Sequence, residues 1–142
     1  MFRNFNLILI SLFSLSGVAQ NNIIQTANNY ISEEYDELLF ISEKEQKMYH
    51  IQNDKIIDIF IISTSAYGTG NKAGSNKTPL GLHRIKEKHG KDTPLNGRMN
   101  GRVFYGKIAT IYNDTTKSKT DDVTSRIFWL EGLEKGKNKG EG

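Results

Sequence analysis

The stretch IFIISTSAYGTGNKAGSNKTPLGLHRI, residues 59–85, decides how the rest of the chain is interpreted. It opens with four consecutive apolar residues, which are typical of a buried strand. Ser63, Thr64 and Ser65 end this run, and residues 68–79 then hold three glycines, two asparagines and a proline, which disfavour both helix and strand. Long loops of this kind are uncommon in compact domains and are usually functional or disordered. Because strand-like residues flank the loop on both sides, we expect it to be functional.

The first 19 residues have the three parts of a secretory signal peptide. Arg3 precedes an apolar run over residues 7–15, and Gly17-Val18-Ala19 supplies the small residues that a signal peptidase reads. A membrane anchor is the alternative, but the run is shorter than the roughly 20 apolar residues that span a bilayer. The pattern predicts a signal peptide over residues 1–19, cleavage after Ala19, and an exported protein of the periplasm or cell envelope with no membrane span in its mature part.

Composition excludes several classes of function. The formal net charge is +3, and the lysines and arginines are scattered, so nucleic-acid binding is not expected. A weak attraction to an anionic cell wall or membrane surface stays open. The 142 residues contain no cysteine, so neither a disulfide nor a thiolate is available to them.

The hydrophobic pattern predicts one mostly β domain with a short N-terminal helix. Apolar residues spaced by three and four indicate the helix within a segment spanning residues 20–37. Three short runs separated by polar turns indicate a β-meander, whose last strand is the most apolar and is expected to lie innermost. Gly106 is expected to mark a bulge. The predicted strands cover residues 38–42, 46–51, 56–63, 80–86, 103–112 and 123–130, residues 86–100 and 115–122 are expected to be loops, and residues 135–142 alone are typical of a disordered tail.

Motifs for phosphate, metal or hydrolase chemistry are not present. A P-loop would need glycine where Asn71 and Asn76 stand, and it would lead into a helix. His50, His83 and His89 lack the spacing of a metal site, so we expect satisfied surface histidines, no metal and no cofactor. No G-x-S-x-G sequence occurs. The residues by themselves therefore indicate no catalytic group.

Three stretches together resemble the L,D-transpeptidase (YkuD-like) catalytic domain of bacterial peptidoglycan remodelling. They are QKMY at residues 46–49, ISTSAYGTGNKAGSNKTPLGLHRI at residues 62–85, and TSRIFWLEGLEKGKNKG at residues 124–140. The first is generic, whereas the second, with its Asn-Lys-Thr-Pro and Pro-x-Gly sequences, is fairly specific. The resemblance implies a β-sandwich or open barrel over residues 38–142, and peptidoglycan stem peptides as the partner.

The family's chemistry, as this resemblance implies, is acyl transfer through a cysteine thioester. Its cysteine and histidine come from a signature, His-Gly-Thr and later Ser-His-Gly-Cys-Ile-Arg, that follows a segment like residues 132–140. The present sequence does not contain that signature, so no catalytic residue is carried over. We expect an incomplete, catalytically inactive N-terminal part of the domain. An exported, non-catalytic peptidoglycan-binding module is the alternative, and the oligomeric state is open. The resemblance places Ser63, Thr78, Pro79 and Gly81 near the substrate cleft.

Overall fold

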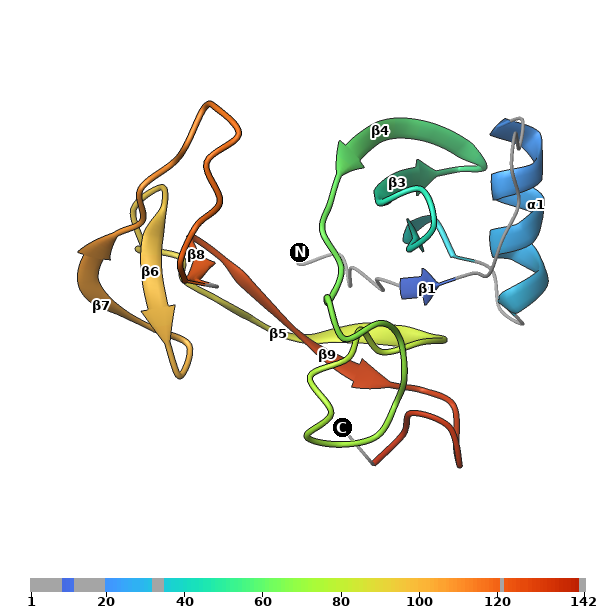
Figure 1. Ribbon diagram of the computed structural model, residues 1–142. Helices are drawn as coiled ribbons and strands as arrows, with labels where there is room; N and C mark the ends of the chain where they lie inside the picture. The colour runs from blue at the N-terminus through green and yellow to red at the C-terminus, as the bar shows by residue number, and fades with distance from the viewer. Residues whose placement is uncertain (1–8, 12–19, 32–34, 121, 141–142) are drawn as a thin grey trace. The chain divides into compact units, whose positions relative to one another are not determined.

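The computed structural model describes residues 9–11, 20–31, 35–120 and 122–140. The predicted cleavage site after Ala19 and the last two residues of the predicted tail lie outside this part. The chain forms two compact units, which are traced in Figure 1 and are treated separately below. The first unit is Met1–Ile85 with Glu131–Gly142, and the second unit is Lys86–Leu130.

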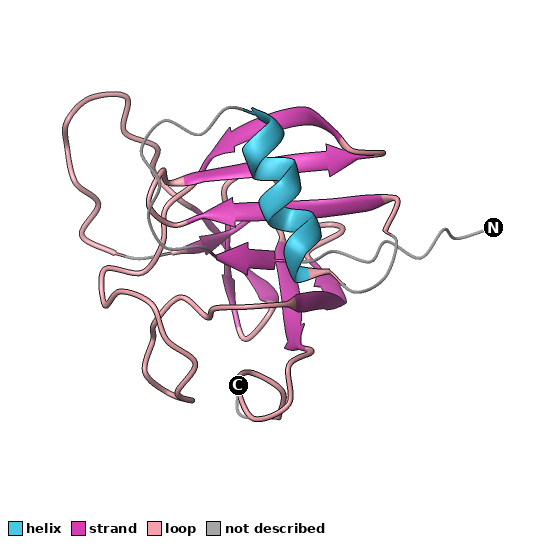
Figure 2. Ribbon diagram, turned by 90° about the vertical axis from the view of Figure 1, so that its right-hand side faces the viewer, coloured by secondary structure: helices cyan, strands magenta, loops and turns pink. Residues whose placement is uncertain are grey.

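Helix α1, Gln20–Tyr30, lies across one face of the sheet in the first unit (Figure 2). Ile23 and Ala27 are four residues apart, so they share one face of the helix, and both are buried. Ala27 is 0% exposed, and its small side chain allows the helix to approach the sheet closely. The side-chain amide of Asn28 also donates a hydrogen bond of 3.0 Å to Asp54 Oδ1 in a sheet turn. The predicted helix is confirmed, although it ends at Tyr30.

The sheet of the first unit has the order β1-β2-β3-β4, with bounds Leu9–Ser11, Glu37–Ser42, Lys47–Gln52 and Lys55–Ile61. Strand β1 pairs with β2 in parallel, whereas β2, β3 and β4 form the predicted antiparallel meander. Its inner face carries Leu38 opposite Ile51 and Phe40 opposite Tyr49, and all four are buried against the helix. Burial, aided by a 2.7 Å hydrogen bond to Glu45, raises the pKa of Tyr49 to about 12, so its hydroxyl remains a neutral donor.

Strand β4 lies at the edge of its sheet, so the expectation that it lies innermost is wrong. Three of its isoleucines are exposed, and Ile61 is 90% exposed. An unbroken apolar run usually means that both faces of a strand are covered. Within the part of the chain that the structure describes, β4 pairs on one side only, with β3. The run of residues in β4 is apolar as expected, but no described strand lies beside its outer edge.

Strands β5, His83–His89, and β9, Ile127–Gly132, pair as a two-stranded sheet, and each strand crosses from one unit into the other. Within the second unit, β7, β6 and β8 form a sheet in that order, with bounds Val103–Ile108, Gly97–Asn100 and Val123–Thr124. The register of β6 against β7 shifts between Gly97 and Met99, and Gly106 has a φ of +86°, which confirms the expected bulge.

The second unit corrects two expectations. Residues 86–100 were expected to be loop, yet they hold the end of β5 and all of β6. Residues 123–130 were expected to form one strand, but Ser125 has a φ of +63° and divides β8 from β9. The Ser125 N–H donates to Gly97 O and its hydroxyl accepts from the Asn96 N–H, so tertiary contacts hold this kink.

In the residues that the structure describes, the fold is mostly β with one short helix, and the sheets do not close, as the sequence predicts. Residues 115–120 are exposed, in agreement with that part of the polar excursion predicted for residues 115–122, whereas Asp122 is half-buried. The strand expected over residues 103–112 ends earlier, because β7 stops at Ile108. In the described segments, no helix combines the length and the apolar character needed to cross a membrane.

Candidate functional site

The loop that follows β4 is anchored at its start by Gln46, in the turn between β2 and β3. The Ile62 N–H donates to the backbone carbonyl of Gln46 at 2.9 Å. The Gln46 side chain accepts from the Thr64 N–H at 2.9 Å and donates to Thr64 Oγ1 at 2.8 Å. This side chain therefore satisfies the backbone where the strand ends and fixes the direction in which the loop leaves the sheet.

The middle of the loop is closed by Ser65 and Thr78. The Ser65 N–H donates to Thr78 Oγ1 at 2.8 Å, and the Ser65 hydroxyl donates to the Asn76 carbonyl at 2.5 Å. Thr78 also bonds through its backbone, donating to Gly68 O and accepting from the Gly70 N–H, each at 3.0 Å. The loop is therefore ordered by its own hydrogen bonds.

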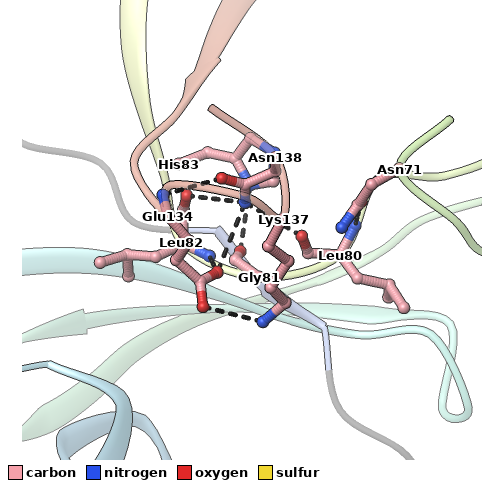
Figure 3. A network of polar contacts seen from close by, with 8 residues as sticks. All are labelled: Asn71, Leu80, Gly81, Leu82, His83, Glu134, Lys137 and Asn138. Atoms are coloured by element: carbon pink, nitrogen blue, oxygen red, sulfur yellow. Dashed lines mark hydrogen bonds and ion pairs between the residues drawn. The ribbon is translucent and has the colours of Figure 1, made fainter. Parts of the chain in front are cut away.

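The far end of the loop reaches Leu80, and β5 begins three residues later, at His83, so the predicted start of this strand at residue 80 is too early. The Leu80 N–H donates to the side-chain oxygen of Asn71 at 2.6 Å, so a residue near the loop tip caps this entry. Leu80 and Leu82 both offer their carbonyls to the side chain of Asn138, at 3.1 Å each. The strand entry is thus held from two directions, as Figure 3 shows.

The partner on the other side is the turn over residues 133–140, which we call the C-terminal turn. Asn138 is 7% exposed, and its Oδ1 accepts from the Glu134 N–H at 2.9 Å. Glu134 Oε2 accepts from the Leu82 N–H at 2.6 Å, and the Leu133 N–H donates to the Leu82 carbonyl at 3.0 Å. We call the set of Leu80, Leu82, Glu134 and Asn138 the clamp. These contacts order the C-terminal turn, so the expectation of a disordered tail is wrong for residues 135–140.

Gly81 lies beneath the clamp. It has a φ of +99°, and a Cβ placed there would stand 1.9 Å from Glu134 Oε2. Only glycine, which has no Cβ, adopts this positive φ readily and also leaves room for the Glu134 carboxylate. His83, two residues later, is 4% exposed and its Nδ1 lies 3.0 Å from the Gly81 carbonyl. The expectation of a surface histidine is therefore wrong for His83.

Glu134 is kept ionised by its neighbours. Burial raises its pKa, but hydrogen bonds from Lys137 and from the Leu82 N–H, together with the positive charge of Lys137 and a contribution from His83, outweigh burial and lower the pKa below its usual value. The Lys137 ammonium stands 2.8 Å from Glu134 Oε1. An ionised carboxylate can accept from both partners at once, which suits its place in the clamp.

The four residues predicted to face a substrate lie in the loop and at the strand entry. Ser63 is exposed at the start of the loop, and Pro79 is half-buried. Thr78 is engaged in closing the loop, and Gly81 is covered by Glu134. The structure thus places Gly81 against the clamp, whereas Thr78 and Pro79 precede it along the chain, and the substrate role of all four remains a prediction.

Sequence reasoning missed the side chains that hold this region: Gln46, Asn71, Glu134 and Asn138. Glu134 and Asn138 fall within the third stretch of family resemblance, which was the available signal for them. Gln46 falls in the generic first stretch, and nothing in the sequence distinguishes Asn71 as a cap for Leu80.

A second polar cluster lies on the sheet of the first unit. His50 lies between two carboxylates of neighbouring strands, with Nε2 2.6 Å from Glu37 Oε1 and Nδ1 3.5 Å from Asp58 Oδ2. Among residues 9–11, 20–31, 35–120 and 122–140, no three His, Cys, Asp or Glu side chains are grouped to hold a metal ion.

Comparison with known proteins gives one match. The family model of the L,D-transpeptidase catalytic domain (YkuD) matches residues 36–134. This range contains strands β2 to β9, the whole loop and Glu134 of the clamp. No curated protein and no solved structure gives a significant match.

Proposed function

The chain belongs to the L,D-transpeptidase family, and from that premise we propose that it binds peptidoglycan stem peptides at the loop over residues 63–79 without transferring an acyl group itself. The family gives the chain its role in peptidoglycan. The ordered loop, closed by Ser65 and Thr78 and fixed by the clamp, is the observation that carries the binding proposal. A binding surface that is already ordered loses less conformational entropy when a ligand binds.

The proposal of no acyl transfer rests on the side chains that are present. Thioester formation needs a thiolate, and these 142 residues contain no cysteine. A serine could replace it only with a base within hydrogen-bond reach. In the described residues, the rings of His50, His83 and His89 contact carboxylates and a backbone carbonyl. The catalytic assembly that the family uses is therefore not built from these side chains.

We further propose that the protein works in the periplasm or cell envelope. The signal-peptide pattern of residues 1–19 supports export, and peptidoglycan lies outside the cytoplasmic membrane. The mature part is proposed to start at Gln20, which is also the first residue of helix α1.

The acyl-transfer part is tested with the purified 142-residue chain and soluble muropeptides that carry stem tetrapeptides. We expect no release of D-alanine and no covalent adduct by intact-protein mass spectrometry. A stem-peptide adduct on any residue would contradict this part of the proposal.

The binding part is tested by sedimentation with purified peptidoglycan sacculi. We expect saturable binding, and Ser63→Phe should weaken it severalfold because it adds bulk at the exposed start of the loop. Thr110→Phe is the matched control, since Thr110 is also exposed but lies in the second unit. If the unsubstituted chain does not bind sacculi, the binding proposal is wrong. The 142 residues then form only a part of a catalytic domain and do not bind peptidoglycan by themselves.

A further inference from the structure

The loop and the C-terminal turn carry a group of exposed lysines. They are Lys72 and Lys77 in the loop, and Lys135 and Lys139 in the turn, and we call these four the lysine surface. In the described part of the chain, none of the four has a carboxylate within ion-pair distance. Their charges are therefore available to a ligand.

These lysines belong to one connected piece of the first unit. Lys72 follows Asn71, which caps the Leu80 N–H, and Leu80 accepts from Asn138, which lies next to Lys139. Lys77 packs on the loop itself, because a Cβ added at Gly70 would lie 3.0 Å from Lys77 Cδ. Lys135 and Lys139 face each other through an isolated β-bridge. Figure 3 shows the contacts that join the loop to the turn.

The acidic residues of this region are already neutralised. Glu134 is paired with Lys137 and accepts from the Leu82 N–H, and Glu131 is paired with Arg84. No aspartate or glutamate occurs between Asp58 and Glu87. The lysine surface is thus locally cationic although the whole chain has a net charge of only +3.

The type of cation indicates the type of anion. Arginine holds one carboxylate or phosphate in a fixed two-point geometry, whereas lysine is a point charge on a flexible stem. The arginine of this region, Arg84, is engaged by Glu131. Several flexible lysines without a free arginine suit repeated, spaced anions better than a single anion in a fixed pocket.

We propose that the lysine surface binds the free carboxylates of peptidoglycan stem peptides and so brings the loop onto the polymer. This inference rests on the proposed function, and it adds the chemical group that is recognised. The contact is electrostatic and solvent-exposed, so it increases the rate and strength of association and weakens as salt is added.

The experiment is salt-dependent sedimentation of the full chain with sacculi. The quadruple variant Lys72→Gln/Lys77→Gln/Lys135→Gln/Lys139→Gln removes the charges and keeps most of each stem. Exposed charge pairs each contribute little, so the four together should change the affinity roughly tenfold. The unsubstituted chain should also lose much of its binding at about 0.5 M NaCl, where the Debye length is well below its physiological value.

The matched control is the quadruple variant Lys44→Gln/Lys55→Gln/Lys107→Gln/Lys117→Gln. It removes four exposed lysines that lie elsewhere, so the net charge falls by the same amount while the lysine surface is unchanged. This control should bind within about twofold of the unsubstituted chain, because uniform net charge acts weakly at a distance in salt. Circular dichroism of both variants establishes that each is folded.

Two treatments of the sacculi identify the anion. Conversion of their carboxyl groups to neutral amides should reduce binding of the unsubstituted chain to the level of the quadruple variant. Removal of phosphate-containing polymers with hydrofluoric acid should leave binding unchanged, and loss of binding after that treatment would overturn the inference in favour of phosphate.

Equal binding by the quadruple variant and the unsubstituted chain would overturn the inference while leaving the proposed function intact. If the unsubstituted chain fails to bind untreated sacculi, both are overturned.

Discussion

At Gly81 the chain needs a left-handed backbone and the absence of a side chain at the same position. Gly81→Ala introduces a methyl group against Glu134 Oε2 and an unfavourable φ of +99°, so it should displace Glu134 from the Leu82 N–H. We expect a loss of about 2–4 kcal/mol in the free energy of unfolding, which is the range for strained backbone combined with a broken buried contact. Urea unfolding measures it.

Gly74→Ala is the control for Gly81→Ala. Gly74 also has a positive φ, of +72°, but a Cβ there would meet no atom within 4 Å. Gly74→Ala should therefore lower the free energy of unfolding by only about 1–2 kcal/mol, because it adds backbone strain without a steric clash. Equal losses for the two variants would show that the close approach at Gly81 has no energetic consequence.

Glu134 should make the clamp sensitive to acid. Its pKa is lowered in the folded protein, so its contribution to stability is present above the unfolded-state pKa and is lost as the pH falls through the lower, folded-state pKa. Glu134→Gln should therefore be less stable than the unsubstituted chain at pH 7, and the difference should shrink in acid. Urea midpoints at pH 7 and at a pH below the usual glutamate pKa compare the two.

The control for this titration is Glu43→Gln, which removes one negative charge from the first unit outside the clamp. A difference between the Glu134 variant and the unsubstituted chain that stays constant from neutral to acid pH would contradict the prediction.

Single residues of the site were the hardest part to predict, because their partners lie far away along the chain. Asn138 bonds to Leu80 across 58 positions, and Gln46 bonds to Thr64 across 18. Lysine and glycine around Asn138 are typical of a flexible tail, and only the fold brings that amide to the carbonyls of Leu80 and Leu82. Local composition cannot report such a contact.

At the scale of elements, the exposed edge of β4 should promote self-association. Among the described strands none pairs with its outer edge, which carries apolar side chains, and this combination favours pairing with another strand. Ile61→Lys places a charge at a position that is 90% exposed. It should change the free energy of unfolding by less than about 0.5 kcal/mol, because the side chain is not packed. Sedimentation velocity should show a larger monomer fraction.

Ile111→Lys is the matched control, since Ile111 is exposed but lies outside the strands. If that substitution reduces self-association as much as Ile61→Lys, general surface hydrophobicity is responsible and the strand edge is not.

Elements with a clear period were predictable and those fixed by their neighbours were not. Helix α1 and the meander follow from apolar spacing, and the turn at Asn53 and Asp54 uses residues that accept the positive φ it requires. Strand β6, with the sequence GRMN, has no strand-like composition and is defined by pairing with β7 and β8. The position of β4 at an edge depends on which strands are beside it, which its own residues do not encode.

At the scale of the whole molecule, export should shorten the chain before it acts. Expression with an intact N-terminus in a bacterial host should give an envelope protein that begins at Gln20, as measured by intact mass and N-terminal sequencing. Replacing the small residue at the predicted cleavage site, Ala19→Lys, should leave the precursor uncut. A mature protein that retains Met1 would contradict the prediction.

The clamp also sets an order of events during synthesis. The loop is complete once residue 82 has been made, yet the groups that fix its far end, on Glu134 and Asn138, are made more than 50 residues later. Contacts between such distant positions form late, because the intervening chain must first be brought together. A growing chain therefore carries this loop without its far anchor while residues 83–134 are being made. The far end of the loop can thereby be fixed only after Glu134 and Asn138 have left the ribosome.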